Sequence, residues 1–321
     1  MNRSRLAFSI KLILGIGLVL LLLSRKDVWQ GATSLLTGLS PLGLAIVLVI
    51  PVPLIWASCL KWRVLLRYRA CAIGLPSLMR YYVMGYFFNN FMPSSLGGDL
   101  ARSYMVGRRI GSQAESFAAV LLERLTGLLT LVALAVIGFL ATPSIHDDLL
   151  VSGSIAIIAG GCLALVAVIW SPERLTAPLK RKAKKHPHGA RLVERLDQMR
   201  TALASFWTTP GIVFQSFAYS LLYHLLTVAN IYITARVLGL HLDLVSLWAV
   251  APIILIIAAL PTTPGGIGVW EWAFSVLLLP VGAELEHGLA VALLLRAQLL
   301  ATSMLGAALY VLDGVQRLRE A

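Results

Sequence analysis

Long apolar runs alternate with short polar segments along most of the chain. A helix needs about 17–25 mainly apolar residues to cross a bilayer. We predict about six full membrane spans, at residues 6–23, 42–60, 116–140, 149–170, 211–235 and 287–311. Two further apolar stretches, 81–110 and 244–282, are interrupted by proline and glycine. The pattern predicts an all-α polytopic membrane protein.

The charges between the apolar runs predict how the spans are oriented. Segment 61–80 carries five basic residues and no acid, and segment 171–200 carries nine basic residues against three acidic ones. Because cytoplasmic loops retain lysine and arginine, we expect both segments and both termini on the cytoplasmic side of a bacterial inner membrane. Segment 141–148, with two aspartates and no base, and the acidic stretch at Glu284 and Glu286 are expected outside.

These orientations agree with one another only if each interrupted stretch enters and leaves the membrane on the same side. Stretch 81–110 then rises from the cytoplasm as a re-entrant helical hairpin, and stretch 244–282 descends from outside as a second one. Non-helical backbone at that depth persists only where protein buries it or where it lines a wet cavity. We therefore expect the two hairpins to meet inside the protein.

The tips of the two expected hairpins have similar sequences. Residues 93–98 read PSSLGG, and residues 261–266, 168 positions later, read PTTPGG. Short proline and glycine strings recur by chance, but here sequence, spacing and charge topology agree. Inverted repeats are typical of transporters whose sites lie at broken helices near the middle of the bilayer. We interpret the chain as one integral membrane domain, with a first half (1–170), a basic cytoplasmic loop (171–206) and a second half (207–321).

Composition narrows the class of protein. Apolar residues make up 58% of the chain and charged residues 13%, whereas soluble domains have about 25% charged residues. The net charge of +12 is explained by basic loops between apolar runs, so we expect no nucleic acid as partner. Apolar positions at helical spacing in 192–206 predict an amphipathic helix on the cytoplasmic face. Three irregularly spaced cysteines predict no disulfide framework, and no spacing predicts a metal site.

Charged residues inside the apolar stretches are the first candidates for function, because each costs at least about 2.5–3.5 kcal/mol in lipid. Asp99 and Arg102 follow Gly97-Gly98, share one face of the expected helix and can pair. Backbone N–H groups of the two glycines, at the start of a helix, suit a phosphate group. An equally weighted alternative is that the preceding serines cap this helix and that the ion pair is structural.

The other charges in the apolar stretches need partners from elsewhere. Glu123 and Arg124 are adjacent and point to different faces of a helix. Glu271 is the lone carboxylate of the second hairpin, and it serves either proton coupling, a gate contact or a structural ion pair with an arginine. The full set of candidate substrate-binding residues is Asn90, Ser94, Ser95, Gly97, Gly98, Asp99, Arg102, Glu123, Arg124, Thr262, Thr263, Gly265, Gly266, Glu271 and Arg296.

These motifs resemble the lysylphosphatidylglycerol synthase transmembrane family, also described as flippase-like or as uncharacterised protein family 0104. The resemblance covers nearly the whole chain. It is carried by Asn90-x-x-Pro93-x-x-x-Gly97-Gly98-Asp99-x-x-Arg102, by Glu123-Arg124 and by Pro261-x-x-Pro264-Gly265-Gly266-x-Gly268-x-x-Glu271. One departure is Gly127, which stands where an acid is expected to follow the Glu-Arg pair and which puts a shared acidic relay in doubt.

The resemblance implies the membrane half of enzymes that aminoacylate phosphatidylglycerol and then move the product across the bilayer. In those enzymes the transfer chemistry belongs to a separate soluble domain, for which a chain ending at Ala321 is expected to have no room. Other relatives are tied to hopanoid lipids and to glycosyltransferases, so the substrate does not carry over. The resemblance therefore implies lipid movement without aminoacyl transfer.

The leading hypothesis is a lipid flippase or transporter for an anionic or phosphate-bearing lipid. A second hypothesis is an accessory membrane subunit that transports nothing and presents lipid to a glycosyltransferase or lipid synthase. A third is a membrane enzyme that uses Glu271 or Asp99 as a base on a lipid. Because nucleophile, zinc-protease and phosphate-loop motifs are absent from the sequence, we expect no enzymatic activity and no cofactor.

Overall fold

The regular secondary structure of the computed structural model is helical throughout the residues that it describes. These residues are 13, 15–22, 24–69, 71–91, 97–170, 190, 193, 206–260 and 262–320. Five segments are long and apolar enough to cross a membrane, namely Pro41–Tyr68, Gln113–Ala141, Pro210–Val237, Pro264–Val281 and Leu285–Asp313. The all-α polytopic architecture expected from the sequence is confirmed.

One predicted span ends later than its apolar run suggests. The run 42–60 becomes α3 (Pro41–Val49) followed directly by α4 (Pro51–Tyr68). The helix therefore continues past the predicted end of the span, to Tyr68. Two further turns of α4 carry Lys61 and Trp62 into the protein, where their side chains are buried. The charge pattern alone does not show that this lysine lies within a packed helix.

Most other predicted spans match single helices with shifted ends. The long helices are α7 (Gln113–Ala141), α8 (Leu149–Trp170), α11 (Pro210–Val237) and α14 (Leu285–Glu320). A short helix that the apolar pattern did not single out, α2 (Lys26–Thr37), packs against α14. The predicted first span at 6–23 and the predicted amphipathic helix at 192–206 fall mostly outside the described residues.

The helices of the interrupted stretches have 17 residues or fewer, at or below the lower limit of about 17 residues for crossing a bilayer. Elements in the first stretch are α5 (Leu75–Phe91) and α6 (Gly97–Ile110), with 17 and 14 residues. Elements in the second stretch are α12 (Leu244–Ala259), η2 (Pro264–Gly266), α13 (Val269–Leu277) and η3 (Leu279–Val281). Helix α13 has only nine residues. The candidate span Pro264–Val281 is thus a series of short turns rather than one continuous helix.

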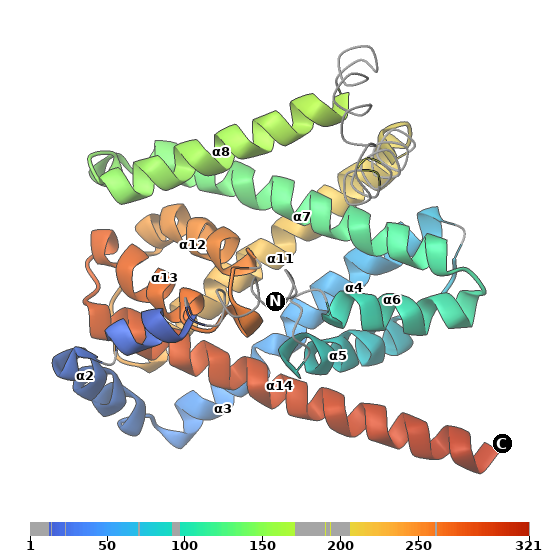
Figure 1. Ribbon diagram of the computed structural model, residues 1–321, viewed down its shortest axis with the longest axis horizontal. Coiled ribbons are helices and arrows are strands. Elements are labelled where there is room, and N and C mark those ends of the chain that lie inside the picture. Colours follow the sequence, from blue (N-terminus) through green and yellow to red (C-terminus); the bar gives the residue numbers. More distant parts are fainter. Residues whose placement is uncertain are drawn as a thin grey trace.

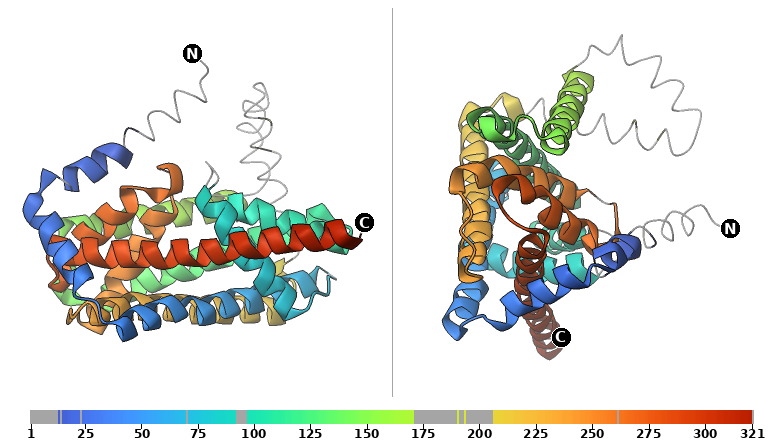
Figure 2. Two further views of the ribbon diagram at one scale, coloured as in Figure 1. Left: turned by 90° about the horizontal axis from the view of Figure 1, so that it is seen from below. Right: turned by 90° about the vertical axis from the view of Figure 1, so that its left-hand side faces the viewer.

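Two long helices pack against both hairpins. Helix α7 lies against α6 of the first hairpin and α12 of the second, while α14 lies against α5 and α13. Figure 1 shows α7 passing above both hairpins and α14 below them, and Figure 2 shows most long helices running along the long axis of the molecule. Helices α4 and α11 pack against each other and complete the bundle.

The arrangement repeats along the chain. A shift of 168 residues carries α3–α4 onto α11, α5 onto α12, α6 onto η2–α13, and α7 onto α14, with most element ends within a few residues. In this correspondence α5 matches α12, and α7 matches α14. The contact between α5 and α14 therefore corresponds to the contact between α12 and α7. The helix order and packing thus share the periodicity of the two glycine motifs. The opposite membrane orientation of the two halves stays a prediction.

The first hairpin depends on two glycines that let its helices approach closely. A Cβ atom on Gly98 would lie 2.3 Å from the carbonyl oxygen of Gly85, a distance that forces the backbone to move. We expect Gly98→Ala to lower the free energy of unfolding by about 1–3 kcal/mol, as overpacking does elsewhere. Thermal unfolding in detergent checks this against Gly153→Ala, since nothing lies within 4 Å of a Cβ at Gly153. Equal unfolding temperatures for the two variants would contradict it.

Candidate functional site

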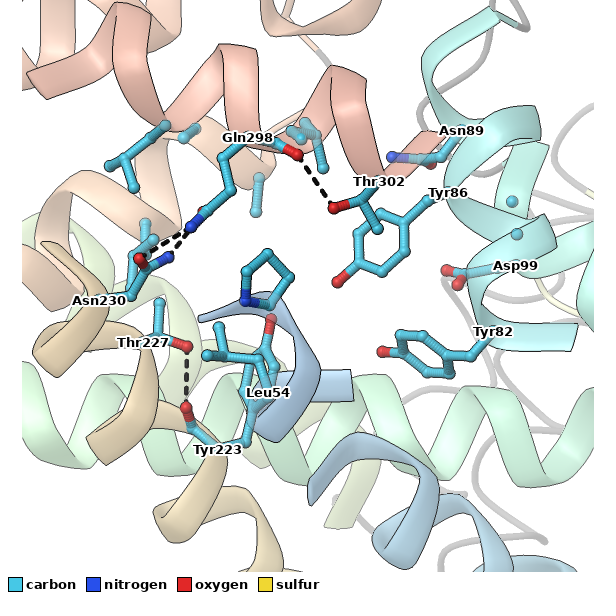
Figure 3. A pocket seen from close by; sticks show the side chains of 18 of the residues that line it. Leu54, Tyr82, Tyr86, Asn89, Asp99, Tyr223, Thr227, Asn230, Gln298 and Thr302 are labelled. Atoms are coloured by element: carbon cyan, nitrogen blue, oxygen red, sulfur yellow. Dashed lines mark hydrogen bonds between the residues drawn. The ribbon is translucent and has the colours of Figure 1, made fainter. Parts of the chain in front are cut away.

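A cavity of about 320 Å³ lies between the two hairpins. Its walls come from both hairpins and from α4, α7, α11 and α14. Gly98 of the first hairpin and Trp270 of the second line the same space, and α5 of the first hairpin contacts η2 of the second. Figure 3 shows polar side chains reaching into this hollow from several helices.

One end of the cavity is an ion-pair cluster centred on a buried aspartate. Arg102 donates from Nε and Nη2 to Oδ1 of Asp99 at 3.1 and 3.0 Å. Arg124 donates from Nε to Oδ2 and from Nη2 to Oδ1 of the same carboxylate at 2.7 and 2.8 Å. The predicted pairing of Asp99 with Arg102 is confirmed. Asp99 is thus held by both arginines.

The two arginines differ in exposure. The side chain of Arg102 is 3% exposed, whereas that of Arg124 is 59% exposed and lines the cavity. Among the described residues, no group accepts a hydrogen bond from Nη1 of Arg124. A cation with an unused donor, open to a cavity, is suited to bind an anion. Arg102 is instead enclosed by protein.

The enclosure of Arg102 comes from three helices. Its Nη1 donates to Oε2 of Glu123 at 2.7 Å. Its guanidinium carbon lies 4.7 Å from the ring centre of Trp62 and 4.7 Å from that of Tyr82, close enough for cation–π attraction. Behind the pair, Lys61 donates from Nζ to the backbone carbonyl of Glu123 at 2.6 Å. Arg102 is thus a structural centre that positions Asp99.

The opposite side of the cavity is neutral and polar. Asn230 of α11 and Gln298 of α14 form a buried amide pair, with Nδ2 donating to Oε1 at 2.9 Å and Nε2 donating to Oδ1 at 3.1 Å. Figure 3 shows this pair across the hollow from Asp99, with the rings of Tyr82 and Tyr86 on the side of Asp99. The cavity therefore combines a charged end with a hydrogen-bonding end.

A second ion pair holds the tip of the second hairpin. Arg296 of α14 pairs with Glu271 through Nε and donates to the carbonyl oxygens of Gly265 and Gly266 at 3.2 and 3.3 Å. The other carboxylate oxygen of Glu271 accepts from the N–H of Gly268 at 2.7 Å and caps the start of α13. Gly265, Gly266 and Gly268 have φ angles of 62°, 68° and 84°, which favour glycine.

The profile of the lysylphosphatidylglycerol synthase transmembrane region matches residues 8–306, a range that contains the cavity, both hairpins and both ion-pair clusters. The chain belongs to this family. A curated relative is a UPF0104 membrane protein of Methanothermobacter thermautotrophicus, 25% identical over 231 residues that cover 65% of this chain and 67% of the relative. No solved structure matches the chain. Family membership and the apolar helices establish a multi-pass membrane protein.

Four of the predicted site residues line the cavity, namely Gly98, Asp99, Arg102 and Arg124. Glu123 and Gly97 lie behind them, since they are buried but outside the cavity wall. The expectation that the adjacent Glu123 and Arg124 find separate partners is confirmed. These residues all belong to the first half of the chain.

The remaining predicted residues that the structure describes lie outside the cavity wall. Asn90 donates to the hydroxyl of Ser303 on α14. In the second hairpin, between α12 and η2, Thr262 is partly exposed and Thr263 is buried. Gly265 and Gly266, predicted to bind substrate, instead offer their carbonyl oxygens to Arg296. Ser94 and Ser95 fall outside the described residues.

Sequence reasoning missed the neutral half of the site. Neither Asn230 nor Gln298 is among the predicted site residues, yet both line the cavity. The signal available was the presence of two amides in apolar runs, where unpaired polar groups are costly. Among the described residues, the cavity wall contains one carboxylate, Asp99, and no histidine or cysteine, so it offers no metal-ligand set.

Proposed function

We propose that the protein binds a phosphate-bearing or otherwise anionic lipid by its headgroup in the cavity and moves that headgroup between the two faces of the membrane. The observation that carries the proposal is the exposed guanidinium of Arg124 inside a cavity between two half-length hairpins. Arg102 pairs with Glu123 behind it, and Arg124 lines the cavity with a donor that no described residue uses. A phosphate oxygen can accept from that donor.

The physical task of such a protein is to lower the cost of taking a polar headgroup through hydrocarbon. A polar group without hydrogen-bond partners costs roughly 2–7 kcal/mol in an apolar medium, and an isolated charge costs far more. In the cavity, an arginine, amides and hydroxyls take the place of the water molecules that hydrogen-bond to the headgroup. The acyl chains stay among the lipids outside. Helices too short to span the bilayer leave room for this polar interior.

The proposal predicts lipid movement by the protein alone. Purified protein in vesicles of neutral phosphatidylcholine, doped with a fluorescent phosphatidylglycerol, should make the inner-leaflet tracer accessible to a membrane-impermeant quencher faster than empty vesicles do. We expect an increase of at least about tenfold, which corresponds to roughly 1.4 kcal/mol of barrier. Vesicles that contain heat-denatured protein are the control for bilayer damage.

Two outcomes separate the proposal from its rival. Rates equal to those of empty vesicles for every anionic tracer, with and without a pH gradient, would contradict lipid movement. If the same preparation nevertheless binds phosphatidylglycerol in a pull-down on lipid-coated beads, the protein presents lipid without moving it, as an accessory subunit would. Binding and movement are therefore measured on one preparation.

A further inference from the structure

The neutral end of the cavity has a fixed hydrogen-bonding pattern. Nε2 of Gln298 also donates to the backbone carbonyl of Val47, and a carbonyl oxygen can only accept. This contact fixes the Gln298 amide with its nitrogen toward Val47. The pairing with Asn230 then fixes the second amide, because Oδ1 accepts from Nε2 and Nδ2 donates to Oε1.

The fixed amide pair has unused capacity. An amide nitrogen has two N–H donors, and an amide oxygen has two acceptor sites. Both donors of Gln298 are used, on Asn230 and Val47, whereas Asn230 uses one of its two. Acceptor sites remain on both amide oxygens. The pair thus presents one donor beside acceptors, and both residues line the cavity.

Further groups around the cavity are neutral and have hydrogen-bonding capacity. The hydroxyls of Thr227 and Thr302 donate to backbone carbonyls of their own helices at 2.8 and 2.9 Å, which leaves their oxygens as acceptors. Oδ1 of Asn89, also in the wall, is buried and has no partner among the described residues. The ring of Tyr86 points into the hollow (Figure 3). None of these groups carries a charge.

We propose that the site selects lipids whose headgroup joins a phosphate to neutral hydroxyl groups, in preference to lipids that join it to an ammonium. This inference rests on the proposed function and specifies its substrate class. The phosphate lies at Arg124, and the hydroxyls lie at Asn230 and Gln298 across the cavity. A hydroxyl both donates and accepts, so it matches a donor beside acceptors. An ammonium only donates, and Asp99, the one carboxylate in the described wall, is already held by two arginines.

The test compares three tracers with the same acyl chains and different headgroups. Phosphatidylglycerol carries hydroxyls, phosphatidylethanolamine carries an ammonium, and phosphatidic acid carries phosphate alone. In the vesicle assay we expect phosphatidylglycerol to move about tenfold faster than phosphatidylethanolamine, a ratio that one or two net hydrogen bonds supply. Asn230→Leu should bring this ratio to within about twofold.

A matched control and an isosteric variant make the result decisive. Asn90→Leu removes an interhelical amide bond to Ser303 that lies outside the cavity wall, so it should keep the wild-type ratio. Thr302→Val removes one wall hydroxyl without changing shape and should lower the ratio even if Asn230→Leu fails to fold. If wild type moves no tracer, the proposed function fails. If it moves all three at equal rates, or if both wall variants keep the wild-type ratio, only the selectivity inference is overturned.

Discussion

Replacing Arg102 with methionine should cost the folded protein about 3–5 kcal/mol, the range measured when one partner of a buried ion pair is removed. Asp99 would keep Arg124, but Glu123 would retain, among the described residues, only the hydroxyl of Tyr82 at 3.4 Å as a side-chain partner. Glu123 is buried, so its charge could not be solvated. A loss of this size is a large fraction of the roughly 5–15 kcal/mol that stabilises most proteins.

Thermal unfolding in detergent measures this loss. Arg108→Met is the matched control, because Arg108 lies exposed on the same helix, and it should unfold close to wild type. Adding Glu123→Gln to Arg102→Met removes the orphaned charge and should recover part of the stability. If Arg102→Met and Arg108→Met unfold at the same temperature, the cluster does not stabilise the fold in the way proposed.

Replacing Arg124 with glutamine should abolish most lipid movement and, unlike the change at Arg102, leave the fold intact. Asp99 would still receive two hydrogen bonds from Arg102, so no buried carboxylate is left alone. The cavity would lose its exposed cation, and a charge-assisted hydrogen bond contributes about 1.5–3 kcal/mol. We expect movement of phosphatidylglycerol to fall by about tenfold to a hundredfold.

The vesicle assay and thermal unfolding together test this separation. Arg124→Lys keeps the charge and should retain more movement than Arg124→Gln, while Arg108→Gln should move lipid at the wild-type rate. Arg124→Gln with full activity would remove Arg124 from the site. If Arg124→Gln lost activity only because it unfolds, its unfolding temperature would be lowered. We expect no such change, because Asp99 keeps its hydrogen bonds from Arg102.

The sequence predicted those parts of the site that depend on local spacing. Asp99 and Arg102 are three residues apart, and a helix places residues at that spacing on one face. Glu123 and Arg124 are adjacent, and a helix turns adjacent residues apart. The glycine motifs predicted two hairpin tips, and the charges around them predicted that the tips approach each other. Each of these inferences uses helix geometry or the pattern of charges and motifs along the chain.

The rest of the site depends on which helices lie side by side. Lys61 reaches Glu123 only because α4 packs against α7, and Asn230 reaches Gln298 only because α11 packs against α14. No spacing along the chain encodes these pairs. The glycines at 265 and 266 show the same limit, because the position of Arg296 on α14 makes their carbonyl groups, rather than their N–H groups, the ones engaged.

The position of the headgroup is the central claim, and photo-crosslinking tests it most directly. A phosphatidylglycerol with a photoreactive diazirine on its headgroup would be incorporated into vesicles with the protein, and the adducts mapped by mass spectrometry. We predict adducts on cavity residues such as Tyr86, Tyr223 and Thr302, reduced in Arg124→Gln. Adducts confined to outward-facing side chains such as Leu163 and Phe214, which are 70% and 74% exposed, would contradict the account.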